Sequence, residues 1–315
     1  MRAEAQTQYA TVNHSPAKTS LTAKVLVGAG LALTIETFLL ISLGGMVRNA
    51  GAGLSCPDWP LCFGKVVPPM DYQVFLEWFH RLMAGSISVF LLGLSSFVFI
   101  KAELRKTLGW YFGSAILLLA AQIILGGLTV LGLLDPMWVS SHLAVALAFF
   151  GVVLLATLKL SDFGKPAATK VMPLSLRRAA VVTTAVLYGQ ILLGGLVSSN
   201  YAGLACPDFP TCNGQWWPAL EGLVTYQVLH RAGALLTTGV LLGFAGFAWK
   251  KLSLVSKRGG LALKALPALL GLQIFFGIGS VFLQLPLPMS VAHLATATCL
   301  LAVMLVVNYE IKRGY

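Results

Sequence analysis

Residues 77–100 read EWFHRLMAGSISVFLLGLSSFVFI, and this stretch indicates a membrane helix. From Leu82 onward it contains no charged residue, and about 20 consecutive apolar residues suffice to cross the hydrocarbon core of a bilayer as a helix. It opens with Glu77, His80 and Arg81, whose side chains are costly inside a membrane and are therefore candidates for a functional site. The stretch predicts both a fold and a site.

The rest of the chain follows the same pattern. Of its 315 residues, 57% are hydrophobic and only 10% are charged, which is more apolar surface than the core of a soluble protein needs. Eight apolar spans are predicted, near 24–47, 77–100, 108–132, 137–159, 179–199, 226–249, 262–285 and 289–309. The composition therefore predicts an all-α integral membrane protein with eight transmembrane helices.

An internal duplication divides the spans into two sets of four. The repeated pairs, 150 or 151 residues apart, are loop 53–62 (GLSCPDWPLC) with loop 203–212 (GLACPDFPTC), His80-Arg81 with His230-Arg231, and His142 with His293. Because each half holds an even number of spans, both halves enter the membrane in the same orientation. We therefore expect two pseudo-symmetric parallel four-helix bundles, at 24–160 and 178–315, with an N-terminal tail at 1–23 and a linker at 161–177.

The basic residues predict the orientation of the chain. The net charge is +11, but only four of the 22 Lys and Arg residues, Arg48, Lys65, Arg81 and Arg231, lie on the side of the cysteine loops. The positive-inside rule then places both termini in the cytoplasm and the loops outside. The charge is thus a topology signal, and we expect membrane lipid and no nucleic acid as partner. With no cleavable signal or transit segment recognised, a bacterial cytoplasmic membrane is favoured.

Four of the five histidines lie in predicted spans, two in each half: His80 and His142, then His230 and His293. All four are on the order of 10 Å or less from the outer end of their span. The two helices of each pair run in the same direction, so the imidazoles can face each other across a bundle, as in a bis-histidine haem site. A zinc site would need more ligands than Glu77 in one half, and polar contacts between helices are the remaining alternative.

Charged neighbours of these histidines extend the two sites. Arg81 and Arg231 are predicted to bind haem propionates, or else their guanidinium groups reach the outer headgroups. Glu77 shares a helix face with His80, whereas its counterpart in the second half is Gln227. This carboxylate is a candidate for proton transfer, with stabilisation of the helix N-terminus as the alternative. Glu36, inside the first span, is a second candidate.

The two cysteine loops are predicted to contain disulfides, Cys56–Cys62 and Cys206–Cys212. Paired cysteines outside the cytoplasm usually form disulfides, and two prolines in each loop restrict the backbone. We expect a structural staple over each site, with a redox role or a zinc knuckle as alternatives.

The motif set as a whole resembles the haem A synthase family. The similarity covers essentially all eight spans and comprises the two cysteine loops, Glu77-x-x-His80-Arg81, His142, His230-Arg231 and His293. It implies oxidation of the methyl group at ring position 8 of haem O to the formyl group of haem A. His80 and His142 would then frame the haem O substrate, Glu77 would be the catalytic carboxylate, and His230 and His293 would ligate a resident haem b. A haem O synthase and the assembly of a haem-copper oxidase are the implied partners.

Two other functions fit parts of the sequence. A dihaem b-type membrane electron-transfer protein would use the same ligands without turnover, but usually has two histidines on each ligand helix, stacking the haems across the bilayer. A transporter is the second, because parallel repeats also occur in transporters.

Overall fold

The structure is a computed structural model, and it describes residues 21–165, 172–251 and 256–314. Within these residues, eight α-helices are long and apolar enough to cross a membrane, and no strand is present. The predicted all-α fold class with eight spans is confirmed, and the chain is a multi-pass membrane protein. Most of the predicted tail (1–20) and part of the predicted linker (166–171) lie outside the described residues.

All eight helices are longer than the predicted apolar spans. Their bounds are α1 (Leu21–Asn49), α2 (Tyr72–Ile100), α3 (Ala102–Leu131), α4 (Pro136–Ser161), α5 (Leu174–Ser199), α6 (Gly222–Trp249), α7 (Lys257–Phe282) and α8 (Leu287–Arg313), with a 3-10 turn, η1 (Ala202–Leu204), before α6.

Local chemistry sets the helix ends that the apolar pattern misses. The side chain of Asp71 caps α2 by accepting a hydrogen bond of 2.8 Å from the Val74 amide, so the helix begins five residues before the predicted span (77 − 72). α7 ends earlier than predicted, because Gln284 and Leu285 take positive φ angles of 58° and 60°, which a right-handed helix cannot accommodate.

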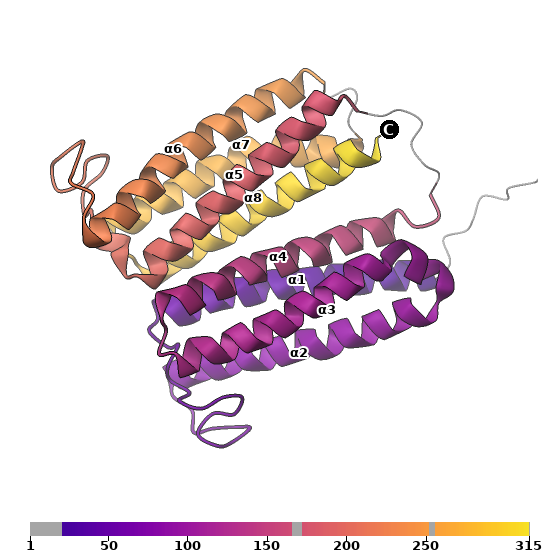
Figure 1. Cartoon of the computed structure of the whole chain (residues 1–315), viewed down its shortest axis with the longest axis horizontal. Helices are drawn as coiled ribbons and strands as arrows, with labels where there is room; N and C mark the ends of the chain where they lie inside the picture. Colours follow the sequence, from indigo (N-terminus) through magenta and orange to yellow (C-terminus); the bar gives the residue numbers. More distant parts are fainter. Residues whose placement is uncertain (1–20, 166–171, 252–255, 315) are drawn as a thin grey trace, which may run out of the picture.

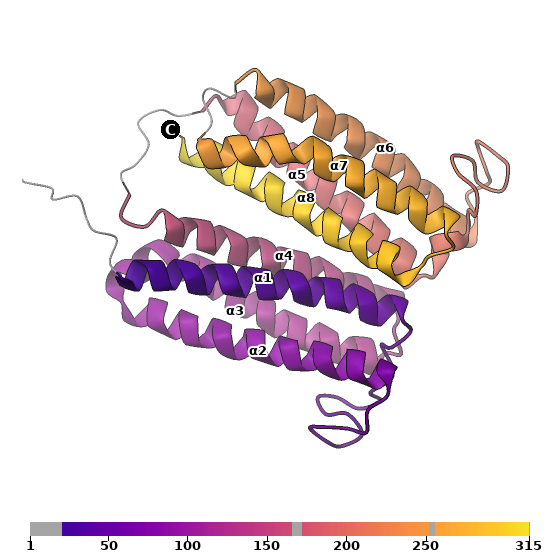
Figure 2. The same ribbon diagram turned by 180° about the vertical axis from the view of Figure 1, so that it is seen from behind.

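The eight helices lie in two groups of four. In Figure 1, α1 to α4 pack side by side, and α5 to α8 form a second group beside them. Figure 2 shows the same arrangement from behind. Helices α1, α4, α5 and α8 make most of the contacts between the groups. Both cysteine loops lie at one end of the molecule, opposite the C-terminus.

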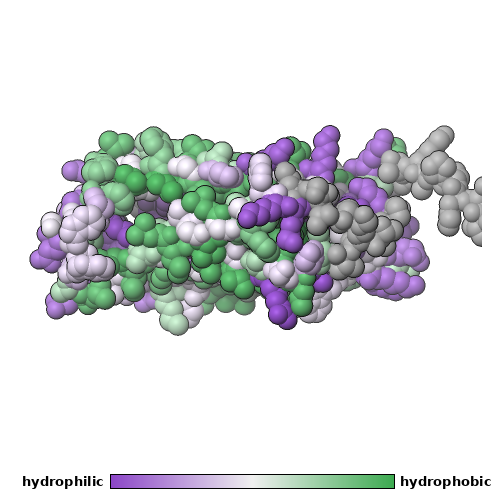
Figure 3. All heavy atoms as spheres, turned by 90° about the horizontal axis from the view of Figure 1, so that it is seen from above, coloured by the Kyte–Doolittle hydropathy of each residue, from purple (hydrophilic) through white to green (hydrophobic). Residues whose placement is uncertain are grey.

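Apolar side chains join the two groups and cover the molecule. Leu147 and Phe150 of α4, Leu187 of α5 and Leu300 and Met304 of α8 belong to one buried cluster, so the core is continuous from one half to the other. On the outside, hydrophobic atoms spread over the middle of the molecule, and hydrophilic atoms gather toward its ends (Figure 3). This distribution is that of a protein surrounded by lipid.

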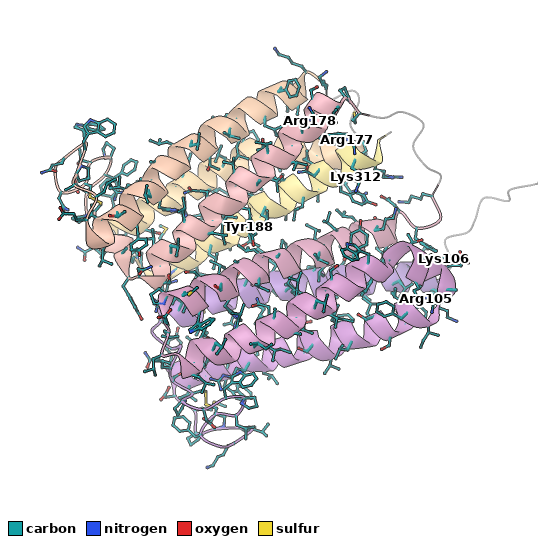
Figure 4. The ribbon with its side chains drawn as sticks, in the orientation of Figure 1. Arg105, Lys106, Arg177, Arg178, Tyr188 and Lys312 are labelled. Carbon is teal, nitrogen blue, oxygen red and sulfur yellow. A yellow bond between two sulfur atoms is a disulfide. The ribbon has the colours of Figure 1, made fainter. Side chains whose placement is uncertain are left out.

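The basic side chains labelled in Figure 4 lie at the end opposite the cysteine loops: Arg105, Lys106, Arg177, Arg178 and Lys312. The charge asymmetry read from the sequence is therefore an asymmetry between the two ends of the molecule. Tyr188 lies between the halves in the same view, where its hydroxyl donates a 2.7 Å hydrogen bond to the Ala144 carbonyl of α4.

Polar groups join the halves at each end of the apolar interface. At the loop end, Arg48 of α1 donates to the Tyr201 hydroxyl at 2.6 Å and to the Ser198 carbonyl at 2.8 Å. At the basic end, Arg258 of α7 donates to Asp162, just after α4, at 2.8 Å and to Glu310 of α8 at 2.5 Å. Burial alone would raise the pKa of Asp162, but hydrogen bonds from Lys165, Tyr309 and Arg258 outweigh it and hold the pKa below its ordinary value.

We predict that Arg258→Leu destabilises the protein. Glu310 is only 1% exposed, so removing Arg258 leaves a buried carboxylate without its main partner. The Arg258 side chain is 34% exposed, so we expect a loss of about 2 kcal/mol, below that for a fully buried pair. A thermal unfolding midpoint in detergent equal to that of the exposed-site control Lys312→Gln would contradict this role.

Candidate functional site

One cavity of about 1440 Å³ contains the predicted site residues of both halves. His80, His142, His230 and His293 all line it. His80 and His230 lie eight residues past the starts of α2 and α6, and His142 and His293 lie six past the starts of α4 and α8. At 1.5 Å per residue these depths are about 12 and 9 Å, so all four imidazoles lie at a similar level near the cysteine loops. Figure 3 shows a hollow near this end of the molecule.

Each histidine ring packs against a glycine of a neighbouring helix. A Cβ atom placed on these glycines would lie close to the Cε1 atom of the imidazole: 3.2 Å for Gly44 and His80, 3.4 Å for Gly126 and His142, 3.0 Å for Gly194 and His230, and 2.8 Å for Gly277 and His293. At Gly277 a side chain would force the ring to move, and at Gly44 and Gly194 the ring would have to give by a few tenths of an ångström, whereas at Gly126 the contact would be an ordinary one. The glycines therefore let the imidazoles lie close against the neighbouring helices.

The second glycine of each repeated Leu-Gly-Gly sequence contacts the other half. A Cβ at Gly45 would lie 2.7 Å from a methyl carbon of Leu294, the residue after His293. A Cβ at Gly195 would lie 2.7 Å from a methyl carbon of Leu143, the residue after His142. Each histidine of α4 and α8 is thus followed by a leucine that packs closely against a glycine of the opposite half.

The histidine pair of the second half is arranged as two ligands of one metal would be. The ring centres of His230 and His293 are 6.5 Å apart, and the ring planes are nearly perpendicular, at 84°. Two imidazoles on opposite sides of one metal ion, each about 2 Å from it, have ring centres roughly 6 Å apart. The ring-centre spacing is therefore close to that of two imidazoles on one metal ion, and the Nε2 atom of His293 lies 3.2 Å from the Gln273 amide nitrogen.

The histidines of the two halves differ in the hydrogen-bond partners of their Nδ1 atoms. In the second half, the Nδ1 atom of His293 is 3.1 Å from the Gln273 carbonyl oxygen, and that of His230 is 3.0 Å from the Gln190 amide nitrogen. In the first half, the buried Nδ1 atoms of His80 and His142 have no hydrogen-bond partner among the described residues. The duplication thus preserves the positions of the rings but not their hydrogen bonds.

Glu77 and Gln227 occupy equivalent positions in the two halves, but their side chains have different hydrogen-bond partners. Both line the cavity and are buried, at 6% and 4% exposure. The Oε1 atom of Glu77 accepts a 2.8 Å hydrogen bond from Nε of Arg81, whereas the Gln227 amide donates to the Gly203 carbonyl at 2.9 Å. The first half therefore has an oriented carboxylate and the second a neutral amide. Glu36 is half-buried and does not appear among the described residues that line the cavity.

Arg81 and Arg231 fasten the cysteine loops to the histidine helices. Nη1 of Arg81 donates to the carbonyls of Asp58 (2.6 Å) and Leu61 (2.5 Å), and Nη2 donates to that of Cys56 (3.1 Å). Arg231 repeats the pattern on the second loop, with the carbonyls of Asp208 (2.8 Å), Thr211 (2.6 Å) and Cys206 (2.7 Å). A guanidinium group has five N–H donors, so these contacts leave each arginine capacity for a further acceptor.

Both predicted disulfides are present, Cys56–Cys62 and Cys206–Cys212. Sulfur atoms bonded to each other cannot serve as zinc thiolates, and the described residues contain no group of three His, Cys, Asp or Glu side chains suited to a metal ion. The zinc alternatives therefore have no support in the structure. The fifth cysteine, Cys299, is a free, half-buried thiol in α8.

An aspartate closes each loop around its disulfide. The carboxylate of Asp58 accepts hydrogen bonds from the amides of Phe63 at 2.6 Å and Gly64 at 2.7 Å. Asp208 likewise accepts from Asn213 and Gly214, and also from the Thr211 hydroxyl. The Thr211 hydrogen bond is the main cause that lowers the pKa of Asp208 to about 2, while the Gly64 amide contributes most to lowering that of Asp58. Both carboxylates are therefore charged at neutral pH.

Comparison with known proteins identifies the family. The model of the COX15-CtaA family, described as cytochrome oxidase assembly protein, matches residues 29–305. The chain belongs to this family. Among its relatives, the heme A synthase of Shewanella oneidensis is 32% identical, with 87% of this chain and 93% of the relative covered. The heme A synthase of Bacillus licheniformis is 27% identical, with 89% and 94% covered.

Some functional contacts of this COX15-CtaA protein escaped the sequence analysis. The loop aspartates, the leucines that follow His142 and His293, and Gln190 were not singled out. Asp58 and Asp208 could have been found, because both halves repeat them within the cysteine loop. Gln190 could not be found by looking for repeated residues, because its counterpart 150 residues earlier is Leu40.

We predict that Arg231→Lys loosens the second cysteine loop. A lysine has one ammonium group and cannot span three carbonyl oxygens as the guanidinium fork does. We expect faster proteolysis within residues 200–221 and a loss of stability of about 1–3 kcal/mol from the carbonyls left without a donor. Arg178→Lys, at the exposed opposite end, is the control, and equal cleavage rates in the two variants would refute the fastening role.

Proposed function

We propose that this chain is a haem A synthase, which oxidises the methyl group at ring position 8 of haem O to a formyl group. The observation that carries the proposal is the repeated pair of cavity-lining histidines, with a carboxylate beside one pair only. Membership of the COX15-CtaA family and the names of the relatives point to the same reaction. The family resemblance gives no support to the dihaem electron-transfer alternative.

The residues present fit a haem. Imidazole nitrogens are common axial ligands of haem iron, and the second-half rings are spaced for one metal. The cavity volume of about 1440 Å³ exceeds that of an ordinary small-ligand pocket, roughly 300–1,000 Å³, and so offers room for more than one large ligand.

We assign different tasks to the two histidine pairs. His80 and His142 hold the haem O substrate beside Glu77, and His230 and His293 hold a resident haem b. The bound haem supplies the iron for oxidation by molecular oxygen with external electrons. The carboxylate beside only the first pair supports this division, because the first pocket then has a group that can move a proton during oxidation.

The protein groups around the substrate site position and transfer protons. Arg81 binds Oε1 of Glu77 and fixes its orientation, and Oε2 is the atom that we assign to proton transfer. The N–H capacity that remains on Arg81 and Arg231 is assigned to haem propionates, whose negative charge suits a cation held by backbone carbonyls. The disulfide loops lie beside both sites and contribute Trp59, Pro60, Phe209 and Pro210 to the cavity lining.

We infer that the protein lies in a bacterial cytoplasmic membrane with both termini in the cytoplasm. The basic end of the molecule would then face the cytoplasm, as the positive-inside rule requires, and the histidines and cysteine loops would lie toward the outer face. A haem O synthase would supply the substrate, and a haem-copper oxidase under assembly would receive haem A.

We predict that Glu77→Gln stops the formation of haem A but leaves haem b bound. The amide keeps the shape of the side chain and cannot exchange a proton, so haem A should fall by roughly 100-fold or more. Haem composition of protein purified from a strain that makes haem O measures both quantities. The control is Glu103→Gln, an exposed carboxylate of α3, and normal haem A in Glu77→Gln would remove Glu77 from the mechanism.

We predict that Gly277→Ala weakens the second haem site. The added methyl would lie 2.8 Å from Cε1 of His293, so the imidazole must move, and haem b affinity should fall roughly 10- to 100-fold. Gly271→Ala, on the same helix, is the matched control because its Cβ would meet no atom within 4 Å. A full low-spin haem spectrum in both variants would show that His293 tolerates the displacement or is not a ligand.

A further inference from the structure

Gln190 of α5 holds His230 of α6 at two points. Its amide nitrogen lies 3.0 Å from Nδ1 of the imidazole and donates a 2.9 Å hydrogen bond to the His230 backbone carbonyl. The side chain therefore ties both the ring and the backbone of His230 to the neighbouring helix. Its Oε1 atom is buried and has no hydrogen-bond partner among the described residues.

Gly233 makes the room that this amide occupies. Gly233 is one helical turn beyond His230, and a Cβ atom there would lie 2.2 Å from Oε1 of Gln190. Any residue other than glycine at 233 would displace the amide from His230. The Gln190 contact therefore depends on two residues on two helices.

The first half lacks both residues. The counterparts of Gln190 and Gly233, 150 residues earlier, are Leu40 and Met83. Leucine offers no hydrogen bond, and Nδ1 of the equivalent His80 is without a partner among the described residues. The two differences between the repeats therefore act together. The second half has an amide against the Nδ1 atom of its histidine, and the first half has the apolar residues Leu40 and Met83 at the equivalent positions.

A partner at Nδ1 changes how an imidazole binds iron. When Nε2 ligates a metal, Nδ1 carries a proton, and a neighbouring acceptor orients the ring and makes it a stronger ligand. An amide can contact Nδ1 in either tautomer, because a half-turn of the group presents Oε1 in place of Nε2, although the turned amide gives up its hydrogen bond to the His230 carbonyl. Gln190 can therefore contact the His230 ring both before and after haem binds, and it holds the backbone only in the orientation seen here.

We infer that Gln190 is a positioning residue that makes the second-half haem a permanent cofactor. The first half, where His80 has no such partner, releases its haem, as a substrate site must. This inference rests on the proposed function and deepens it, because it names the interaction by which one duplicated site retains haem and the other exchanges it.

The test measures haem retention and electronic structure in the full-length protein purified from cells that make haem O. For Gln190→Leu we expect transfer of haem b to excess apomyoglobin to become roughly 10- to 100-fold faster. The reduction potential of haem b should rise, because the ligand donates less electron density, and its low-spin electron paramagnetic resonance signal should shift. Gln190→Glu, which keeps an acceptor, should restore retention and lower the potential.

Matched variants separate positioning from general damage. Gly233→Ala should reproduce the effects of Gln190→Leu, because the methyl displaces the amide, whereas Gly239→Ala on the same helix meets no atom within 4 Å and should not. The double variant Leu40→Gln with Met83→Gly installs the amide in the first half and should slow the release of haem from that site.

Two results would overturn the inference. One of them leaves the proposed function standing, and the other contradicts it as well. If the wild-type protein binds haem b but Gln190→Leu and Gly233→Ala match it in transfer rate, potential and resonance signal, Gln190 does not position the ligand and the proposed function stands. If the wild-type protein binds no haem, the proposed function fails and this inference fails with it.

Discussion

The close contact between each imidazole and a glycine of the adjacent helix is the constraint on which the rest of the site depends. A histidine in a membrane span is costly unless it lies in a protein interior with a partner or a ligand. The four glycines let neighbouring helices approach until the rings line one shared cavity. A side chain at Gly277 would push its ring aside, and one at Gly44 or Gly194 would crowd the ring, so the positions of the rings depend on how the helices pack.

The duplication gives two similar sites that differ in a few polar residues. The histidines, glycines, arginines and disulfide loops recur in both halves, so the two sites share a pair of buried imidazoles beside a disulfide loop. Two of the polar differences between the halves are Glu77 in place of Gln227 and Leu40 in place of Gln190. The first supplies a carboxylate to one site, and the second provides an amide that holds His230 in the other. Leu143 and Leu294, each inserted into the opposite half, keep the two sites in a fixed relation.

Much of this arrangement could be predicted from the sequence, because its signals are local or repeated. The eight helices follow from apolar length, and the site histidines follow from the cost of a polar side chain in lipid and from recurrence at a fixed offset. The helix ends were less accurate, since caps such as Asp71 and positive φ angles such as that of Gln284 do not alter hydropathy. The fastening of the loops by Arg81, the ion pairs of Asp162 and the Gln190 contact escaped because each joins segments far apart in the chain, which pattern and composition do not relate.

The most direct measurement is an experimental density map of the protein purified with haem from cells that make haem O. The account predicts one planar macrocycle in each half, with iron bound by imidazole nitrogens of His230 and His293 in the second half and of His80 and His142 in the first. Haem found outside the cavity, or both histidine pairs turned away from the metal, would contradict it.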